Sequence, residues 1–212
     1  MLTTLVHSDI AKVWFWLIVA RCVVAATSPC TELQGAKAKQ ELAYLQRDRA
    51  KLEPACIVYA IEQLGLQYHA IPGQHSAGAE AAAATLVIYL DFQAPATENI
   101  GRGIVPLPRT HWSAEKYPAA DSLVEIGKPS TLSLVHTIGS ADSPEFLRKN
   151  AMKVLFAIYS GDLAAGARAL NNASRSASDN GTAARLLSAA REFAAKCPGQ
   201  WRSGCEAAIL ER

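Results

Sequence analysis

The sequence has few charged residues and almost no excess of either sign. Lys, Arg, Asp and Glu make up 19% of the 212 residues, and the formal net charge is only +2. A nearly neutral chain has no charge-based reason to bind nucleic acid. Half of the residues are apolar, so the chain does not belong to the disordered class, which combines few apolar residues with a high net charge.

Aromatic residues are scarce, and catalytic or metal-binding motifs are missing. Only 7% of the residues are Phe, Trp or Tyr. The Gly-x-Ser-x-Gly motif of serine hydrolases does not occur, and no two cysteines have the Cys-x2-Cys spacing of zinc sites. We therefore expect no catalytic residues, no metal and no cofactor.

Apolar runs long enough to span a membrane are missing as well, and the run near the N-terminus is short. Residues 13–20 are apolar, follow Lys12 and precede Arg21. A basic residue, a short apolar core and small residues after it form the pattern of a secretory signal, and cleavage after Ala26 fits that pattern best. The run is far shorter than the roughly 20 residues that span a membrane. The sequence predicts a signal peptide over 1–26 and a secreted or periplasmic protein without stable membrane insertion after cleavage. An uncleaved anchor is the alternative.

Four cysteines follow the predicted cleavage site, and an even number in an exported protein predicts disulfides. Proximity in the sequence favours the pairs Cys30–Cys56 and Cys197–Cys205 among the three possible pairings. The first bond would tie the start of one helix to the next helix, and the second would close a small loop.

Two helices are expected at the start of the mature chain. Residues 31–53 have a narrow stripe of leucines among basic residues, which predicts one amphipathic helix within an N-terminal segment 27–53. A second helix is expected over 55–64, because Pro54 fits the first turn of a helix and Gly65 is a typical stop signal.

Helical patterns continue to the C-terminus. Residues 79–92 are apolar nearly throughout and predict a buried helix, with a strand at 86–90 as the alternative. Later in the chain, helices are expected over 117–127, 130–139, 145–160, 162–177, from 181 onward, and over 199–211.

Several of these helices have apolar residues at equivalent places. The equivalent sets are Ile57, Ile61 and Leu64, then Ala119, Leu123 and Ile126 after 62 residues, then Ala151, Leu155 and Ile158 after 32 more. A lone helix pair cannot bury its apolar faces, so neighbouring pairs must stack. The sequence predicts an all-α fold, in which a short α-solenoid of stacked antiparallel helix pairs over 54–212 follows the N-terminal helix.

One stretch resembles a HEAT-repeat unit. Residues 120–135 show a first helix that ends in Ile126-Gly127, then Pro129 at the turn, then a leucine-rich second helix. Residues 146–158 resemble the first helix of a following unit, and the similarity is best over 117–160. The resemblance implies a helical scaffold that binds partners, and it implies no catalytic residues.

The region 93–116 interrupts the regular pattern and is rich in proline and glycine, which predicts a long loop. It contains Arg109, His111 and Trp112. Arginine and tryptophan are enriched at binding hot spots, so we expect these three residues to contact a partner. The alternative is that Trp112 only packs the loop onto the helix that follows.

Together these observations predict a non-catalytic scaffold for protein–protein interaction in an exported compartment, with a protein partner that the sequence does not identify. Two alternatives remain. The chain could bind a small ligand in a groove between helix pairs, or, less favoured, it could be a hydrolase that uses the long loop.

Overall fold

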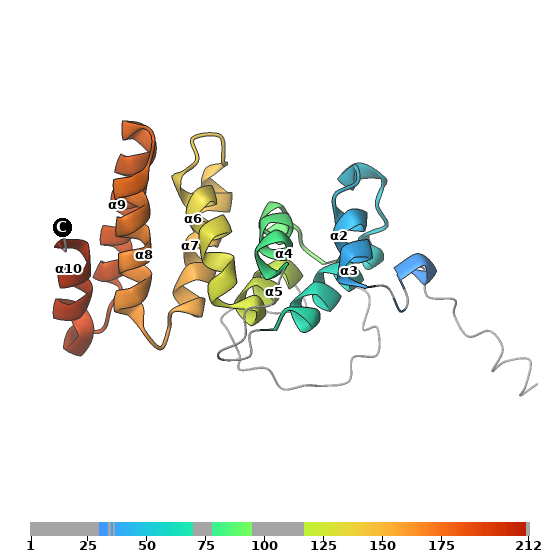
Figure 1. Ribbon diagram of the computed structural model, residues 1–212, viewed down its shortest axis with the longest axis horizontal. Helices are drawn as coiled ribbons and strands as arrows, with labels where there is room; N and C mark the ends of the chain where they lie inside the picture. Colours follow the sequence, from blue (N-terminus) through green and yellow to red (C-terminus); the bar gives the residue numbers. More distant parts are fainter. Residues whose placement is uncertain (1–29, 34, 36, 70–77, 95–116, 211–212) are drawn as a thin grey trace, which may run out of the picture.

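The computed structural model describes residues 30–33, 35, 37–69, 78–94 and 117–210, and all regular secondary structure in them is helical (Figure 1). This confirms the all-α fold class for the described residues. The α-helices are α2 (Ala38–Leu45), α3 (Pro54–Gln67), α4 (Ala79–Leu86), α5 (Pro118–Ile126), α6 (Thr131–Gly139), α7 (Glu145–Ile158), α8 (Leu163–Ser176), α9 (Asn180–Ala195) and α10 (Arg202–Leu210). Short 3-10 helices are η1 (Thr31–Leu33), η2 (Arg49–Lys51), η3 (Val87–Tyr89), η4 (Lys128–Ser130) and η5 (Gly199–Trp201).

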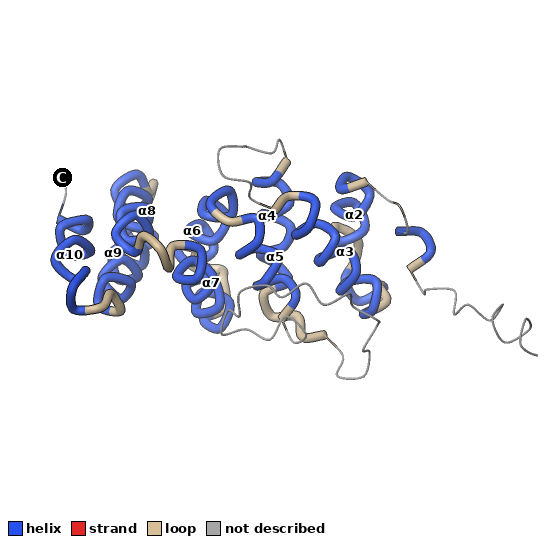
Figure 2. The backbone as a smooth tube through the Cα atoms, turned by 90° about the horizontal axis from the view of Figure 1, so that it is seen from below, coloured by secondary structure: helices blue, strands red, loops and turns tan. Residues whose placement is uncertain are grey.

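Consecutive α-helices pack on each other in pairs. Helix α2 packs on α3, α4 on α5, α6 on α7 and α8 on α9, while α10 packs against both α8 and α9. Contacts of α3 with α5, of α5 with α7 and of α6 with α9 join one pair to the next. Figures 1 and 2 show the pairs following one another along the long axis, from α2 at one end to α10 at the other.

Local signals in the sequence account for several helix ends. Pro54 and Pro118 occupy the first turns of α3 and α5, where a missing N–H costs nothing. Asp179 caps α9, because its carboxylate accepts a hydrogen bond from the Thr182 N–H at 2.8 Å. Gly127 ends α5 with a φ of 72°, a backbone conformation that glycine adopts without strain.

The core contains nearly all of the apolar positions that the sequence aligns in α3, α5 and α7. Eight of these nine side chains are buried; Ile158 is only partly buried. It is the last residue of α7, where the chain leaves the helix. The buried positions are Ile57, Ile61, Leu64, Ala119, Leu123, Ile126, Ala151 and Leu155.

Gly65 lies inside α3 and is buried, so the expectation that it ends this helix is wrong. A Cβ atom at this position would lie 2.6 Å from Glu125 Oε2 and 2.7 Å from Ser122 Oγ. The glycine therefore allows α5 to approach α3 closely. The Ser122 hydroxyl donates a hydrogen bond to the Ile61 carbonyl at 2.9 Å across this contact.

The single helix expected over 31–53 is also wrong, because η1, α2 and η2 share this segment. Asp48 caps η2 and helps to separate it from α2. Arg49 donates a hydrogen bond to Asp91 at 2.8 Å, and its guanidinium lies 5.2 Å from the centre of the Tyr89 ring. These contacts with the chain that follows α4 oppose a straight continuation of α2.

Both expected cysteine pairs are at disulfide distance, and the pairing is confirmed. The Cα atoms of Cys30 and Cys56 lie 5.2 Å apart, and those of Cys197 and Cys205 lie 6.7 Å apart. All four residues are buried. The first disulfide ties the chain before α2 to α3, and the second ties the end of α9 to α10 across η5.

Within the described ranges, none of the helices combines the length and the apolar character that crossing a lipid bilayer requires. The expected signal peptide over 1–26 and most of the expected loop over 93–116 lie outside these ranges.

Candidate functional site

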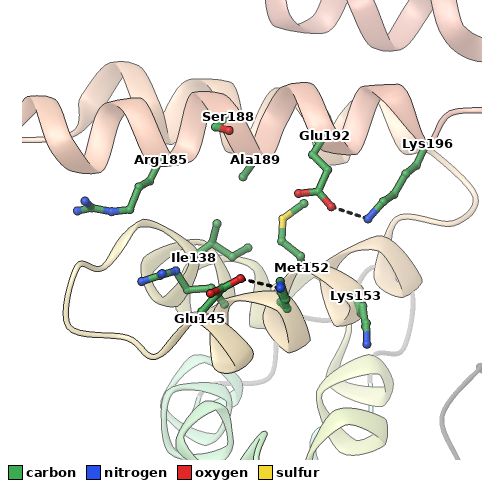
Figure 3. A pocket seen from close by; sticks show the side chains of 11 residues that line it. Ile138, Glu145, Met152, Lys153, Arg185, Ser188, Ala189, Glu192 and Lys196 are labelled. Carbon is green, nitrogen blue, oxygen red and sulfur yellow. Dashed lines mark hydrogen bonds and ion pairs between the residues drawn. The ribbon is translucent and has the colours of Figure 1, made fainter.

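A groove lies between α7 and α9, at the junction of two neighbouring helix pairs (Figure 3). It has a volume of about 380 Å³. Figure 3 shows Glu192 and Lys196 of α9 on the side of Met152 of α7, whereas the Lys153 side chain points away from α9. The lining residues are Ile138, Glu145, Arg148, Lys149, Met152, Lys153, Arg185, Ser188, Ala189, Glu192 and Lys196.

The groove exists because α6 meets α9 more closely than α7 does. A Cβ atom on Gly139, the last residue of α6, would lie 3.1 Å from both Leu186 Cδ1 and Thr182 Cγ2 of α9. Helix α7 contacts α9 less extensively. The space between these two helices is floored by Ile138, Met152 and Ala189, which are mostly buried.

Two arginines at the groove are held by backbone carbonyls near the end of α6. Arg185 Nε donates to the Gly139 carbonyl at 2.7 Å. Arg148 Nη1 donates to the Ser143 carbonyl at 2.5 Å and, more weakly, to the Ser140 carbonyl at 3.4 Å. The Gly139 carbonyl lies at the C-terminus of α6, where partial negative charge favours a guanidinium, whereas Ser143 lies in the loop four residues after α6. The two arginines are therefore fixed in place before any ligand binds.

Two ion pairs line the same groove. On α7, Lys149 Nζ lies 2.6 Å from Glu145 Oε1, and on α9, Lys196 Nζ lies 2.7 Å from Glu192 Oε1. The hydrogen bond from Lys149 lowers the pKa of Glu145, and the same bond raises the pKa of Lys149, with a further contribution from the charge of Glu192. Charge interactions thus extend across the groove from α7 to α9.

The groove offers an apolar floor and a surface on which cations exceed anions. Five of its side chains are basic and two are acidic, and both acidic ones are paired with a lysine. Its lining residues include neither histidine nor cysteine. This arrangement can hold a ligand that presents carboxylates around an apolar group.

A separate cluster of ionisable residues, outside the groove, lies where α3 meets α5. Glu125 is partly buried, and burial raises its pKa, while the charge of His69 acts in the opposite direction. Asp121 and Glu62 are near enough to raise this pKa further. In the part of the chain that the structure describes, no three histidine, cysteine or carboxylate residues are arranged to hold a metal ion.

The partner-contact residues expected from the sequence, Arg109, His111 and Trp112, lie outside the described residues, and their role stays a prediction. The sequence suggested a groove between helix pairs only as an alternative, and it identified none of the residues that line this groove. The sequence does indicate one side of the groove. Arg148 is four residues from Met152, and Lys149 is four residues from Lys153, so each pair lies on one face of the same helix. Nothing in the sequence, however, indicates that α9 lies opposite them.

Comparisons of the chain with protein-family models, with curated proteins and with solved structures find no match.

Proposed function

We propose that this protein is an exported, non-catalytic scaffold that binds a protein partner in the groove between α7 and α9. Its helix pairs form a short HEAT-like α-solenoid in this proposal. The support comes from the pairwise packing of successive helices and from the burial of equivalent apolar positions in α3, α5 and α7.

Two observations support the exported compartment. The N-terminal sequence has the order of charge, apolar core and small residues that a secretory signal requires. The two buried disulfides suit an oxidising environment, because such bonds are rare where thiols are kept reduced.

The groove is the observation on which partner binding depends most. Repeat proteins bind partners on extended surfaces to which successive repeats contribute, and this groove takes side chains from two neighbouring helix pairs. This groove combines mostly buried apolar residues with charged residues around them. That is the composition of a protein–protein contact, with an apolar centre and a polar rim.

A substitution that fills the groove tests the proposal. Ser188 is exposed on α9 within the groove, so Ser188→Trp should occupy it without removing a core side chain. Affinity capture with the mature, disulfide-bonded chain from its native exported fraction should lose the bound protein in this variant. Ala207→Trp on α10 is the matched control, because Ala207 is exposed and lies outside the groove. Equal capture by both variants and the wild type would refute binding at this groove.

A small-ligand binding protein is the second candidate, and the groove's volume favours it. About 380 Å³ lies within the range of roughly 300–1,000 Å³ typical of small-molecule sites. Native mass spectrometry of the purified protein separates the two functions. A co-purifying small molecule that is lost in Ser188→Trp would support this candidate over a protein partner.

A further inference from the structure

We propose that the partner segment bound between α7 and α9 is an acidic, extended peptide with an apolar side chain among its carboxylates. This inference rests on the proposed function, since it names the chemistry of the partner at the same groove.

The charges of the groove favour an acidic partner. Its two carboxylates, Glu145 and Glu192, already have lysine partners at 2.6 and 2.7 Å. The two arginines differ from these lysines. Within the described residues, Arg148 and Arg185 donate hydrogen bonds to carbonyl and hydroxyl oxygens. Neither arginine lies within ion-pair distance of a carboxylate of these residues, although the charge of Arg148 helps to lower the pKa of Glu145 and that of Arg185 helps to lower the pKa of Asp179.

The arginines are also preorganised for carboxylate recognition. Arg148 uses Nη1 for both of its hydrogen bonds to backbone carbonyls, which leaves the other edge of its guanidinium for a ligand. Arg185 donates through Nε and Nη2, and its Nη1 makes neither of these bonds but lies beside Gly181, near the carboxylate of Asp179. An anchored guanidinium loses little conformational freedom when it binds a carboxylate, and charge-assisted bonds of this kind are strong.

The length of the groove fits a short extended segment. Its lining on α9 runs from Arg185 to Lys196, which corresponds to about 16 Å at 1.5 Å per helical residue. An extended peptide rises about 3.3 Å per residue, so about five residues fit along it. Alternate side chains of such a segment point to opposite sides, so one apolar side chain can contact Ile138, Met152 and Ala189 while its neighbours face the arginines.

A nucleic acid is a poorer fit, because its continuous negative charge would pass the carboxylates of Glu145 and Glu192. The chain also has a net charge of only +2, which gives no long-range attraction for a polyanion. The chain's own region 93–116 is also a poorer occupant of the groove. It is not acidic, since its lysine and arginines outnumber its glutamates.

The experiment uses the mature, disulfide-bonded chain and a short fluorescein-labelled peptide in which glutamates flank one central leucine. Fluorescence anisotropy should show saturable binding at low salt. A peptide with glutamine in place of glutamate should bind about tenfold more weakly, because it loses charge-assisted hydrogen bonds. A peptide with glycine in place of leucine should also bind more weakly, because it loses the apolar contact.

Variants of the protein then locate the site. Arg148→Gln and Arg185→Gln remove the charge, and each should weaken binding of the acidic peptide about tenfold. At position 185 the Gln amide nitrogen takes the place of Arg Nε and can still donate to the Gly139 carbonyl. At position 148 it ends two bonds short of Nη1, so the bonds to the Ser140 and Ser143 carbonyls are lost. Arg191→Gln is the matched control: Arg191 lies on α9, is exposed and does not line the groove, so it should leave binding unchanged. Changes made in the peptide cannot unfold the protein, so the test stays decisive even if an arginine variant is unstable.

Three results would overturn the inference. In the first, the acidic peptide does not bind. In the second, the glutamine peptide binds as tightly as the glutamate peptide. In the third, heparin or single-stranded DNA displaces the acidic peptide, and replacing its central leucine has no effect on binding. In each case the Ser188→Trp capture experiment still decides the proposed function. If that variant loses its partner, the groove binds a partner of other chemistry; if it keeps its partner, the proposed function fails as well.

Discussion

Replacing Gly65 by alanine would test the close contact of α3 and α5 directly. The added methyl group would lie 2.6 Å from Glu125 Oε2, 2.7 Å from Ser122 Oγ and 2.9 Å from Ser122 Cβ. The glutamate side chain is flexible and can move away. Ser122 Cβ cannot, because it is fixed to the backbone of α5, so the two helices must separate or shift.

The expected cost comes from two opposing effects. Inserting a methyl group into a packed contact typically destabilises by about 1–3 kcal/mol, and the hydrogen bond from Ser122 to the Ile61 carbonyl would be strained. Alanine is favoured over glycine within a helix by about 1 kcal/mol. We expect a net loss of about 1 kcal/mol, which lowers the Tm of a chain of this size by about 2–4 °C.

Thermal unfolding followed by circular dichroism, with the disulfides intact, measures this effect. Gly204→Ala is the matched control, since a Cβ atom on Gly204 of α10 meets nothing within 4 Å and alanine should only stabilise the helix. If Gly65→Ala raises the Tm as Gly204→Ala does, then α3 and α5 are not in this close contact and the reasoning fails.

Three further predictions address the core, a buried carboxyl and the long loop. Leu155→Ala should destabilise by roughly 2–5 kcal/mol, because this side chain is fully buried; a change below about 0.5 kcal/mol in a denaturant titration would refute its core position. Burial raises the pKa of Glu41, so the folded state binds this proton more tightly, and stability falls as pH rises through the raised pKa. Glu41→Gln keeps an acceptor for the hydrogen bond from Gln67 and should raise the Tm at neutral pH, with a gain that shrinks on acidification; a gain that does not depend on pH would contradict this cause. The sequence predicts that the loop contacts the partner as well as the groove, so Trp112→Ala should weaken partner capture with little change in Tm, whereas a lower Tm with intact capture would show that Trp112 only anchors the loop.

Local signals were enough to predict most helix boundaries of this fold. The starts of α3 and α5 follow from Pro54 and Pro118, and the burial of Leu123 and Leu155 follows from helical spacing. Proximity in sequence also predicted both disulfides. Each of these features depends on residues that are close together in the chain, so it can be predicted from a single sequence.

The errors share a different origin. Local rules make Gly65 a stop signal, but the glycine is needed here because α5 packs too closely to leave room for a side chain. Helix α5 begins about fifty residues later in the sequence, so a local pattern cannot reveal this contact. The N-terminal helix is interrupted where Arg49 meets Asp91 and Tyr89, which lie about forty residues away. Periodicity does not report such distant contacts.

The groove depends on distant contacts even more strongly, because Arg148 and Arg185 belong to different helix pairs. Arg185 donates to the last carbonyl of α6, whereas the short bond of Arg148 goes to Ser143 in the loop between α6 and α7. Gly139 supplies one of these carbonyls and also allows the close contact of α6 with α9. Packing between the helix pairs and the position of Arg185 are therefore coupled. It follows that a bulkier residue at Gly139 should separate α6 from α9 and release Arg185 at the same time, whereas Arg185→Gln should weaken peptide binding and leave the helix packing in place.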